Sequence, residues 1–402
     1  MTLHRFHSKK YLSKDFSQMS IIPVTEGEIQ SVICSRKAKD SGVYNGVSTR
    51  ILKMSNSLIS KLLSYICNKS NQTGVFLDHL KYAIVKPLFK YGDSSSISNY
   101  RCISLLSVFS KILEKTMYSR LNQQISINNI LVMEQYGCRK DWSTEHATYT
   151  LINGILQAWN SKLQVVGIFC DLTKALDCVN HDILIEKLKY YGVNETCIDW
   201  IKSCLYNRRQ RVDINVNNVQ NYSSTWEILK RGVPHGSVLG PLLFITYIND
   251  MPRHINRFTN VVLFADGTSI FNYRKNYENL NQTIRLTLDC SSRWFKANQL
   301  VPNFMKTNII KFSPSHFLQS QMINEHINTS ISEVPDTKFI GVQTDNHLYW
   351  KCHIDRILSK LIIAGFVIRV ILCNKSENLM NGILCLLSLN HQIWNYILEQ
   401  CN

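Results

Sequence analysis

Two β-prone runs in the third quarter of the chain are joined by a segment that permits only a tight reversal. Val261 to Phe264 and Ser269 to Tyr273 flank the tetrapeptide Ala-Asp-Gly-Thr, and so short a connection predicts a β-hairpin. Upstream, Val165 to Cys170 is a compact apolar run that ends at Asp171 and predicts a buried strand. Helical patterns such as Leu105 to Leu121 alternate with these strands, without internal repeats. We therefore expect an α+β fold with a mainly antiparallel sheet packed on helices.

The charge balance narrows the class of partner. Lys and Arg number 45 against 29 Asp and Glu, a formal net charge of +16, which favours polyanions such as nucleic acid without identifying one. With 45% hydrophobic and 18% charged residues the chain is expected to be globular. The 13 cysteines include no C-x-x-C pair, which argues against a zinc knuckle and a disulfide framework and for a reducing compartment.

The apolar stretches bear on location. The longest, such as Leu361 to Cys373, is too short to cross a bilayer and contains Arg369. The first sixteen residues lack the continuous apolar core of a signal peptide. We expect a soluble intracellular protein, cytoplasmic or nuclear or both, with no membrane association and no obvious protein partner.

Two aspartates at strand ends are candidate metal ligands. Asp171 follows the predicted strand, and Asp266 lies at the tip of the predicted hairpin. Metal-assisted phosphoryl transfer needs hard oxygen ligands on a rigid frame, and strand-borne carboxylates meet when their strands are neighbours. Taken alone, Asp266-Gly267 is more often just a type I′ turn, and Asp171 is equally consistent with a helix N-cap.

A glycine- and proline-rich segment, GVPHGSVLGP (Gly232 to Pro241), precedes an apolar run. Glycines allow a backbone to approach a ligand closely, and prolines restrict the turns around them. In isolation, an ordinary loop between a strand and a helix is the favoured explanation of the segment.

The order of these segments along the chain resembles the reverse transcriptases of non-LTR (LINE-type) retrotransposons, insect-like ones in particular. The resemblance runs from about Thr25 to Lys360. Seven blocks in the family's order carry it: KYAIVKPLFKYGD (81–93), SNYRCISLLSVFSKILEK (98–115), EQYGCRKDWST (134–144), FCDLTKALDCVNHDIL (169–184), RGVPHGSVLGPLLFITYINDMP (231–252), LFADGTSIF (263–271) and KFIGVQTDNHLYWKCHI (338–354).

The resemblance implies a right-hand polymerase with fingers, palm and a partial thumb. We expect an N-terminal extension and helical segment over residues 1–75, fingers and palm over 76–275, and the palm remainder and partial thumb over 276–402. No endonuclease-like segment precedes these blocks and no cysteine-rich knuckle is present, so we expect only the polymerase portion of an element.

The resemblance also implies the chemistry. Asp171 and Asp266 would bind two Mg²⁺ (or Mn²⁺) ions for nucleotidyl transfer from deoxynucleoside triphosphates onto a DNA primer along an RNA template. Lys306, in PNFMKT, matches a lysine near the pyrophosphate that acts as general acid; an ordinary surface lysine is the alternative. Trp350 and His353 are expected to have a packing role.

The resemblance implies that six further residues contact the incoming nucleotide: Lys86, Lys90, Arg101, Leu176, His235 and Gly236. Arg101 is the favoured phosphate clamp because guanidinium binds phosphate bidentately, with a solvated surface arginine as the alternative. A basic cluster, Arg208, Arg209 and Arg211, is expected to contact template or primer phosphates.

The chain departs from the family's pattern at several positions. Gly267 stands where the family has a second adjacent aspartate, which removes a carboxylate from the metal site. His235 replaces a glutamine, and Leu176 replaces the aromatic residue that excludes ribonucleotides. Cys102 and Cys138 replace a proline and an aromatic residue. We expect a degenerate copy with weakened or absent catalysis.

Two other functions remain open at this point. One is a noncatalytic nucleic-acid-binding protein derived from a retrotransposon, which keeps the basic cleft and has lost the metal site. The other is a group II intron maturase, which shares the palm; without a maturase-like helical domain or C-terminal nuclease in the sequence, it ranks last.

Overall fold

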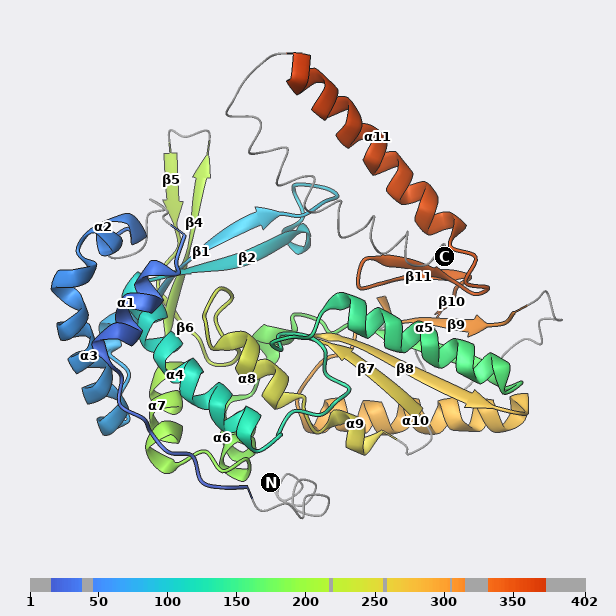
Figure 1. Ribbon diagram of the computed structural model, residues 1–402, viewed down its shortest axis with the longest axis horizontal. Coiled ribbons are helices and arrows are strands. Elements are labelled where there is room, and N and C mark those ends of the chain that lie inside the picture. The colour runs from blue at the N-terminus through green and yellow to red at the C-terminus, as the bar shows by residue number, and fades with distance from the viewer. Residues whose placement is uncertain are drawn as a thin grey trace. The chain divides into compact units, whose positions relative to one another are not determined.

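The predicted hairpin is present in the computed structural model, which describes residues 16–37, 46–216, 220–255, 259–303, 306–314 and 332–373 (Figure 1). Strand β7 (Thr259–Phe264) pairs antiparallel with β8 (Gly267–Arg274), and Phe264 lies opposite Gly267. Ala265 and Asp266 alone make the turn. The φ of Ala265 is +52° whereas that of Asp266 is not positive. A type I′ turn needs a positive φ at both central residues, so this alternative is wrong.

The hairpin belongs to a five-stranded sheet with the strand order β10-β9-β3-β8-β7. Its other strands are β3 (Gln164–Cys170), β9 (Asn308–Phe312) and β10 (Ser332–Glu333). β8 pairs antiparallel with both β3 and β7, whereas β10 pairs with β9 in parallel. The expectation of a mainly antiparallel palm sheet is therefore corrected: the sheet is mixed. A long connection separates β9 from β10, and parallel pairing requires such a connection where a hairpin would not.

Helices α5 (Thr144–Asn160) and α10 (Tyr277–Ala297) lie on opposite sides of this sheet (Figure 1). In α5, Ala147, Leu151 and Ile155 are buried at intervals of one helical turn, so a single apolar face meets the strands. Both faces of β3 are thereby covered, and its residues from Val165 to Phe169 are buried. The end of β3, where Asp171 follows, is held in a rigid frame.

A second sheet has the order β2-β1-β4-β5, with β6 paired to β4. β1 pairs antiparallel with β2 and parallel with β4. The strands are β1 (Tyr82–Phe89), β2 (Tyr100–Leu106), β4 (Arg209–Val216), β5 (Gln220–Ser223) and β6 (Glu227–Ile228). Arg101 opposes Leu88 and Lys86 opposes Ile103 across the β1–β2 pair.

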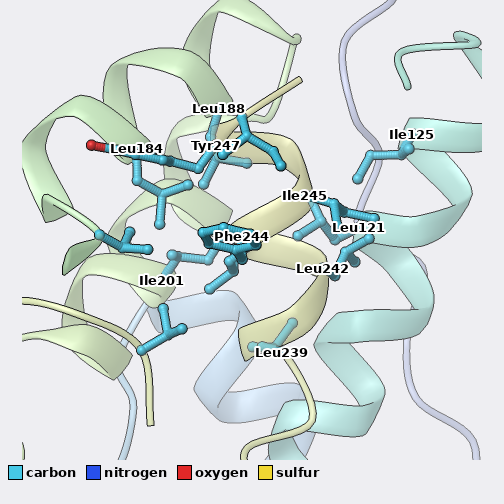
Figure 2. Packing of buried hydrophobic residues seen from close by; sticks show 14 of the residues in the cluster. Leu121, Ile125, Leu184, Leu188, Ile201, Leu239, Leu242, Phe244, Ile245 and Tyr247 are labelled. Atoms are coloured by element: carbon cyan, nitrogen blue, oxygen red, sulfur yellow. The ribbon is translucent and has the colours of Figure 1, made fainter. Parts of the chain in front are cut away.

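The main hydrophobic core surrounds α8 (Gly240–Tyr247), which is buried on nearly every side. Pro241 stands in its first turn, where a missing N–H costs nothing. Figure 2 shows Phe244 and Tyr247 of α8 beside Leu184, Leu188 and Ile201, with Leu242 and Ile245 beside Leu121 and Ile125. The surrounding helices are α4 (Val108–Ile127), α6 (His181–Tyr190) and α7 (Glu195–Leu205). This core anchors the glycine-rich segment, whose last two residues begin α8.

The remaining short elements extend this frame. At the start of the first helix the Thr25 hydroxyl accepts a hydrogen bond from the N–H of Glu28. The elements are α1 (Glu26–Cys34), α2 (Thr49–Met54), α3 (Asn56–Thr73), α9 (Met251–His254) and the 3-10 turns η1 (Asp78–Leu80), η2 (Ile97–Asn99) and η3 (Ala175–Cys178).

The chain divides into two compact units, Met1–Ile309 with Gln319–Glu333, and Ile310–Leu318 with Val334–Asn402. The second unit contains the antiparallel pair β11 (Asp336–Phe339) and β12 (Val342–Asp345), followed by α11 (Lys351–Cys373). Within it the rings of Trp350 and His353 contact edge to face at 6.4 Å between centroids. The domain boundaries expected at residues 75 and 275 stay predictions. Among the described helices, none combines the length and apolarity needed to span a bilayer.

Candidate active site

The two predicted aspartates lie at the ends of neighbouring strands. Asp171 follows Cys170, the last residue of β3, and Cys170 pairs with Thr268 of β8. Asp266 stands in the turn just before β8 begins at Gly267. The pairing of β3 with β8 therefore brings both carboxylates to the same edge of the sheet. Asp171 is half-buried and Asp266 is exposed, so a substrate can reach both.

The pKa of Asp266 reflects its burial and the charged groups near it. Partial desolvation at the turn raises the pKa of the Asp266 carboxyl above its ordinary value, and the negative charge of Asp171 raises it further. A hydrogen bond from the main chain of Asp266 itself lowers this pKa, as do the positive charges of Arg101 and Lys306. The site therefore joins two like charges with two cationic side chains from distant parts of the sequence.

Lys306 is held beside Asp171 by main-chain hydrogen bonds. The N–H of Asn303 donates to the carbonyl of Asp171 at 2.8 Å, and the N–H of Lys306 donates to the carbonyl of Asn303 at 3.0 Å. The Lys306 Nζ then lies 3.5 Å from Asp171 Oδ2, although half of the lysine side chain is exposed. An exposed pair of this length contributes little to stability, so the position of the ammonium group is the informative feature.

The turn has room for a side chain at Gly267. A Cβ added there would meet the carbonyl oxygen of Phe264 at 3.4 Å, an ordinary van der Waals distance, and the φ of Gly267 lies outside the left-handed region. The backbone at this position is therefore compatible with an aspartate, and glycine is not required by the hairpin.

Hydrogen bonds hold the glycine-rich segment between β2 and the 3-10 turn η3. Val233 N–H donates to the carbonyl of Leu176 at 2.9 Å, and Ser104 N–H donates to the carbonyl of His235 at 2.9 Å. Gly236 has a φ of +96°, and a Cβ there would lie 2.9 Å from the carbonyl oxygen of Ser104. This position needs glycine both for its conformation and for the close approach to β2.

His235 makes an ion pair within the site region. Its Nε2 lies 3.1 Å from Oδ1 of Asp177. The hydrogen bond to Asp177 raises the pKa of His235; burial opposes this, and the charges of Asp177 and Asp266 add to the rise. The charge of the protonated histidine is thus directed at Asp177, and Asp266 adds a weaker influence. Leu176 is partly buried against the core, with its main chain tied to Val233.

The three basic residues of the β1–β2 pair differ in their relation to the carboxylates. Arg101 is exposed on β2, and its charge acts on Asp266. Lys86 is half-buried, and the Lys90 ammonium lies 4.8 Å from the centroid of the Tyr91 ring. Of these three residues in the part of the chain that the structure describes, Arg101 is the one whose charge lowers the pKa of Asp266.

Arg208, the first residue of the basic cluster after α7, is buried, although we expected it at the surface. Arg208 is 2% exposed, and its Nη2 lies 3.5 Å from Oε1 of the fully buried Glu114. The prediction that Arg208 contacts nucleic-acid phosphates is therefore wrong, because a buried carboxylate needs a buried cation beside it. Arg209 is exposed, and Arg211 pairs with Asp213 at 3.1 Å; their contacts with phosphates stay predictions.

Sequence reasoning missed residues that position the site. Glu114 of α4 accepts a hydrogen bond from the N–H of Val238 in the glycine-rich segment at 2.7 Å. Gln135 is fully buried and accepts a hydrogen bond from the Ala265 N–H in the hairpin turn at 3.2 Å. For Glu114, the available signal was a carboxylate among the apolar positions of a helical pattern. For Gln135, it was a glutamine within the block 134–144, to which the resemblance assigned no function.

A cavity of about 300 Å³ lies elsewhere on the same sheet. Residues of α5, β7 and β8 line it, among them Leu151, Val261 and Phe271, and neither Asp171 nor Asp266 contributes to it. The two carboxylates stand outside this cavity, which belongs to the packing between α5 and the sheet.

Comparisons with known proteins show what the chain is similar to. The sequence pattern of the reverse transcriptase (RNA-dependent DNA polymerase) family matches residues 89–344. The chain is 35% identical over 244 residues to the probable RNA-directed DNA polymerase from transposon BS of Drosophila melanogaster, covering 58% of this chain and 26% of that protein. It is 26% identical over 364 residues to the RNA-directed DNA polymerase from mobile element jockey of the same species, covering 87% and 38%.

The chain thus spans between about a quarter and two-fifths of the length of these relatives, 26% and 38% respectively. Among solved structures, apo telomerase from Candida tropicalis truncated from its C-terminal domain is similar with a TM-score of 0.46 at 15% identity, over 73% of this chain and 59% of that one.

Proposed function

The chain belongs to the reverse transcriptases of non-LTR retrotransposons, and from that premise we propose that it carries out RNA-directed DNA polymerisation with a metal site weakened by Gly267. The convergence of Asp171 and Asp266 at one edge of the sheet carries the proposal. An RNA template, a DNA primer and deoxynucleoside triphosphates are the proposed partners.

The residues present fit a divalent metal. Asp171 and Asp266 offer hard oxygen ligands; burial and then the charge of Asp171 raise the pKa of Asp266, and a bound cation offsets the repulsion between the two carboxylates. Within the described residues no cluster of three or more His, Cys, Asp and Glu side chains is arranged for a metal, so the triphosphate and water would supply the other ligands. Two Mg²⁺ or Mn²⁺ ions, when bound, lower the pKa of the primer 3′-hydroxyl and stabilise the charge on the leaving pyrophosphate.

The side chains around the carboxylates have complementary roles in this proposal. Arg101 binds the triphosphate, with Lys86 and Lys90 adding positive charge along the same strands. Lys306 donates a proton from its Nζ to the leaving pyrophosphate, and its distance of 3.5 Å from Asp171 supports that placement.

The glycine-rich segment and the turn η3 would meet the nascent base pair. Gly236 lets the backbone approach the base pair, and His235 interacts with the incoming nucleotide where the family has glutamine. Leu176 faces the sugar of that nucleotide, where a leucine crowds the 2′-hydroxyl less than an aromatic ring does. Weak discrimination between deoxyribonucleotides and ribonucleotides follows.

The loss of a carboxylate at Gly267 defines the proposed defect. Removing groups that only orient metal ligands typically costs roughly 10–100-fold, and removing a direct ligand costs at least that. Asp171 and Asp266 remain, so residual activity with Mg²⁺ or Mn²⁺ is expected.

Primer extension on an RNA template with purified protein tests the proposal. Extension should require Mg²⁺ or Mn²⁺ and should be abolished by Asp171→Asn, which keeps the shape of the side chain and removes its charge. Asp182→Asn, at a carboxylate bonded to the Tyr206 hydroxyl at 2.6 Å, is the matched control and should extend normally. Extension by Asp171→Asn equal to wild type would refute the proposed site.

A second function, noncatalytic nucleic-acid binding, is favoured by one observation, the glycine at position 267 in a chain of net charge +16. Salt-dependent binding of an RNA–DNA hybrid without any extension, in wild type and in Gly267→Asp alike, would select it.

A further inference from the structure

The segment from Glu134 to Gly137 runs beside the hairpin as an extra edge. The N–H of Leu263 in β7 donates to the carbonyl of Glu134 at 2.8 Å, and the N–H of Tyr136 donates to the carbonyl of Leu263 at 2.8 Å. Gln135 thereby forms a parallel bridge with Leu263. These bonds place the Gln135 side chain next to the turn that carries Asp266.

The Gln135 amide oxygen accepts hydrogen bonds from its own segment and from the hairpin turn. The residue is fully buried, and its Oε1 accepts hydrogen bonds from the N–H of Gly137 at 2.8 Å and of Ala265 at 3.2 Å. Both partners are donors, so the amide oxygen, and not the nitrogen, must face them. In the part of the chain that the structure describes, the buried Nε2 has no hydrogen-bond partner. The hydrogen bonds of this side chain are therefore made by its amide oxygen and not by its amide nitrogen.

The turn needs this support. Ala265 has a φ of +52°, a conformation that residues with a Cβ adopt at a cost. At Gly137 a Cβ would stand 2.2 Å from the Ala265 nitrogen, so the two backbones pass closer than any other residue at 137 would permit. A bond to the Ala265 N–H at this contact determines how the turn is oriented, and the next residue along the turn is Asp266.

We propose that Gln135 is a positioning residue: through the Ala265 N–H it holds the hairpin turn in its strained conformation and so directs the Asp266 carboxylate toward Asp171. The catalytic meaning of this role rests on the proposed polymerase function. The bond itself and its effect on the turn do not.

Amide hydrogen exchange at single-residue resolution tests the bond. Gln135→Met keeps the volume and removes the acceptor, and it should accelerate exchange at Ala265 roughly tenfold, the effect of one lost hydrogen bond. Gln124→Met is the matched control, because buried Gln124 donates to the carbonyl of Ser17 at 2.6 Å, far from the hairpin in the sequence and with no bond to it; it should leave Ala265 unchanged.

Exchange at Ala265 that is equal in Gln135→Met and wild type, or equally accelerated by Gln124→Met, would overturn the proposal. If Gln135→Met fails to fold, the wild-type chain still decides, since an unprotected Ala265 amide is incompatible with the bond.

A second readout separates positioning from folding. In the Gly267→Asp background, Gln135→Met should raise the Mn²⁺ concentration for half-maximal extension roughly tenfold, and Gln124→Met should not. If no variant extends a primer, the polymerase proposal fails while the exchange result still judges Gln135. If extension occurs with unaltered exchange and metal requirement, the Gln135 proposal alone fails.

Discussion

Glu114 of α4 accepts a hydrogen bond from the N–H of Val238 at 2.7 Å while the Arg208 guanidinium lies 3.5 Å from its other oxygen. Glu114 is 0% exposed. One buried carboxylate thus joins a helix, the start of β4 and the glycine-rich segment of the candidate site. Its removal leaves the buried Arg208 without its opposite charge and the part-buried Val238 N–H without its acceptor.

Glu114→Ala is therefore expected to destabilise the protein by about 3–5 kcal/mol, measured as the free energy of unfolding in urea. Asp199→Ala is a suitable control, since its pair with Lys202 at 3.6 Å is exposed and such pairs contribute about 0–1 kcal/mol. The double variant Glu114→Leu with Arg208→Met should recover much of the loss, because no unpaired charge remains buried. Equal losses in Glu114→Ala and Asp199→Ala would contradict the role of Glu114.

Gly267→Asp is expected to raise metal-dependent primer extension at least ~10-fold. The added carboxylate restores a ligand beside Asp266, and the backbone accepts it with the nearest contact at 3.4 Å. The rate of extension at saturating Mn²⁺ and Mg²⁺ measures the effect. Gly267→Asn has nearly the same shape without the charge and should gain little; an equal gain in both would show that packing, and not metal binding, limits activity.

Leu176→Phe should shift sugar preference toward deoxyribonucleotides. A ring at this partly buried position crowds the 2′-hydroxyl of a ribonucleotide more than leucine does, and a contact of that size changes discrimination by about tenfold. The ratio of kcat/KM for a deoxynucleoside and a ribonucleoside triphosphate reports it. Leu176→Met, similar in volume, should leave the ratio unchanged, and a ratio that is the same in Leu176→Phe and wild type would remove Leu176 from the sugar contact.

The pair of His235 and Asp177 predicts a pH-dependent contribution to stability. The hydrogen bond to Asp177 raises the pKa of folded His235, so the stabilisation is full below the unfolded pKa, about 6.5, and is lost as the pH rises through the folded value. The unfolding free energy of wild type minus that of His235→Gln should therefore fall as the pH rises through this window. A difference that is constant with pH would show that the pair carries no charge.

Asp171 and Asp266 show which parts of the candidate site could be predicted from the sequence. The hairpin around Asp266 was predicted because a short connection between β-prone runs leaves one local solution. Its turn type was predicted less well: Ala265, and not Asp266, takes the positive φ. The convergence of Asp171 and Asp266 came only from the resemblance, since nothing local in the chain states that β3 pairs with β8.

Arg208 and Gln135 show what sequence reasoning could not reach. Arg208 stands in a basic run typical of a nucleic-acid surface, yet it is buried against Glu114. Gln135 lies 130 positions from Ala265, to which it bonds. Burial and pairing of this kind depend on how distant elements pack, and a local pattern carries no information about them.

The sequence by itself determined the hairpin and the strand that ends at Asp171, because each depends on neighbouring residues, and it shows directly that position 267 has no carboxylate. Only the tertiary structure decided the mixed sheet, the burial of Arg208 and the contact of Lys306 with Asp171 across 135 positions. Their physical cause is the shared core around α8 and β3, which determines the partners that distant backbone and charged groups find.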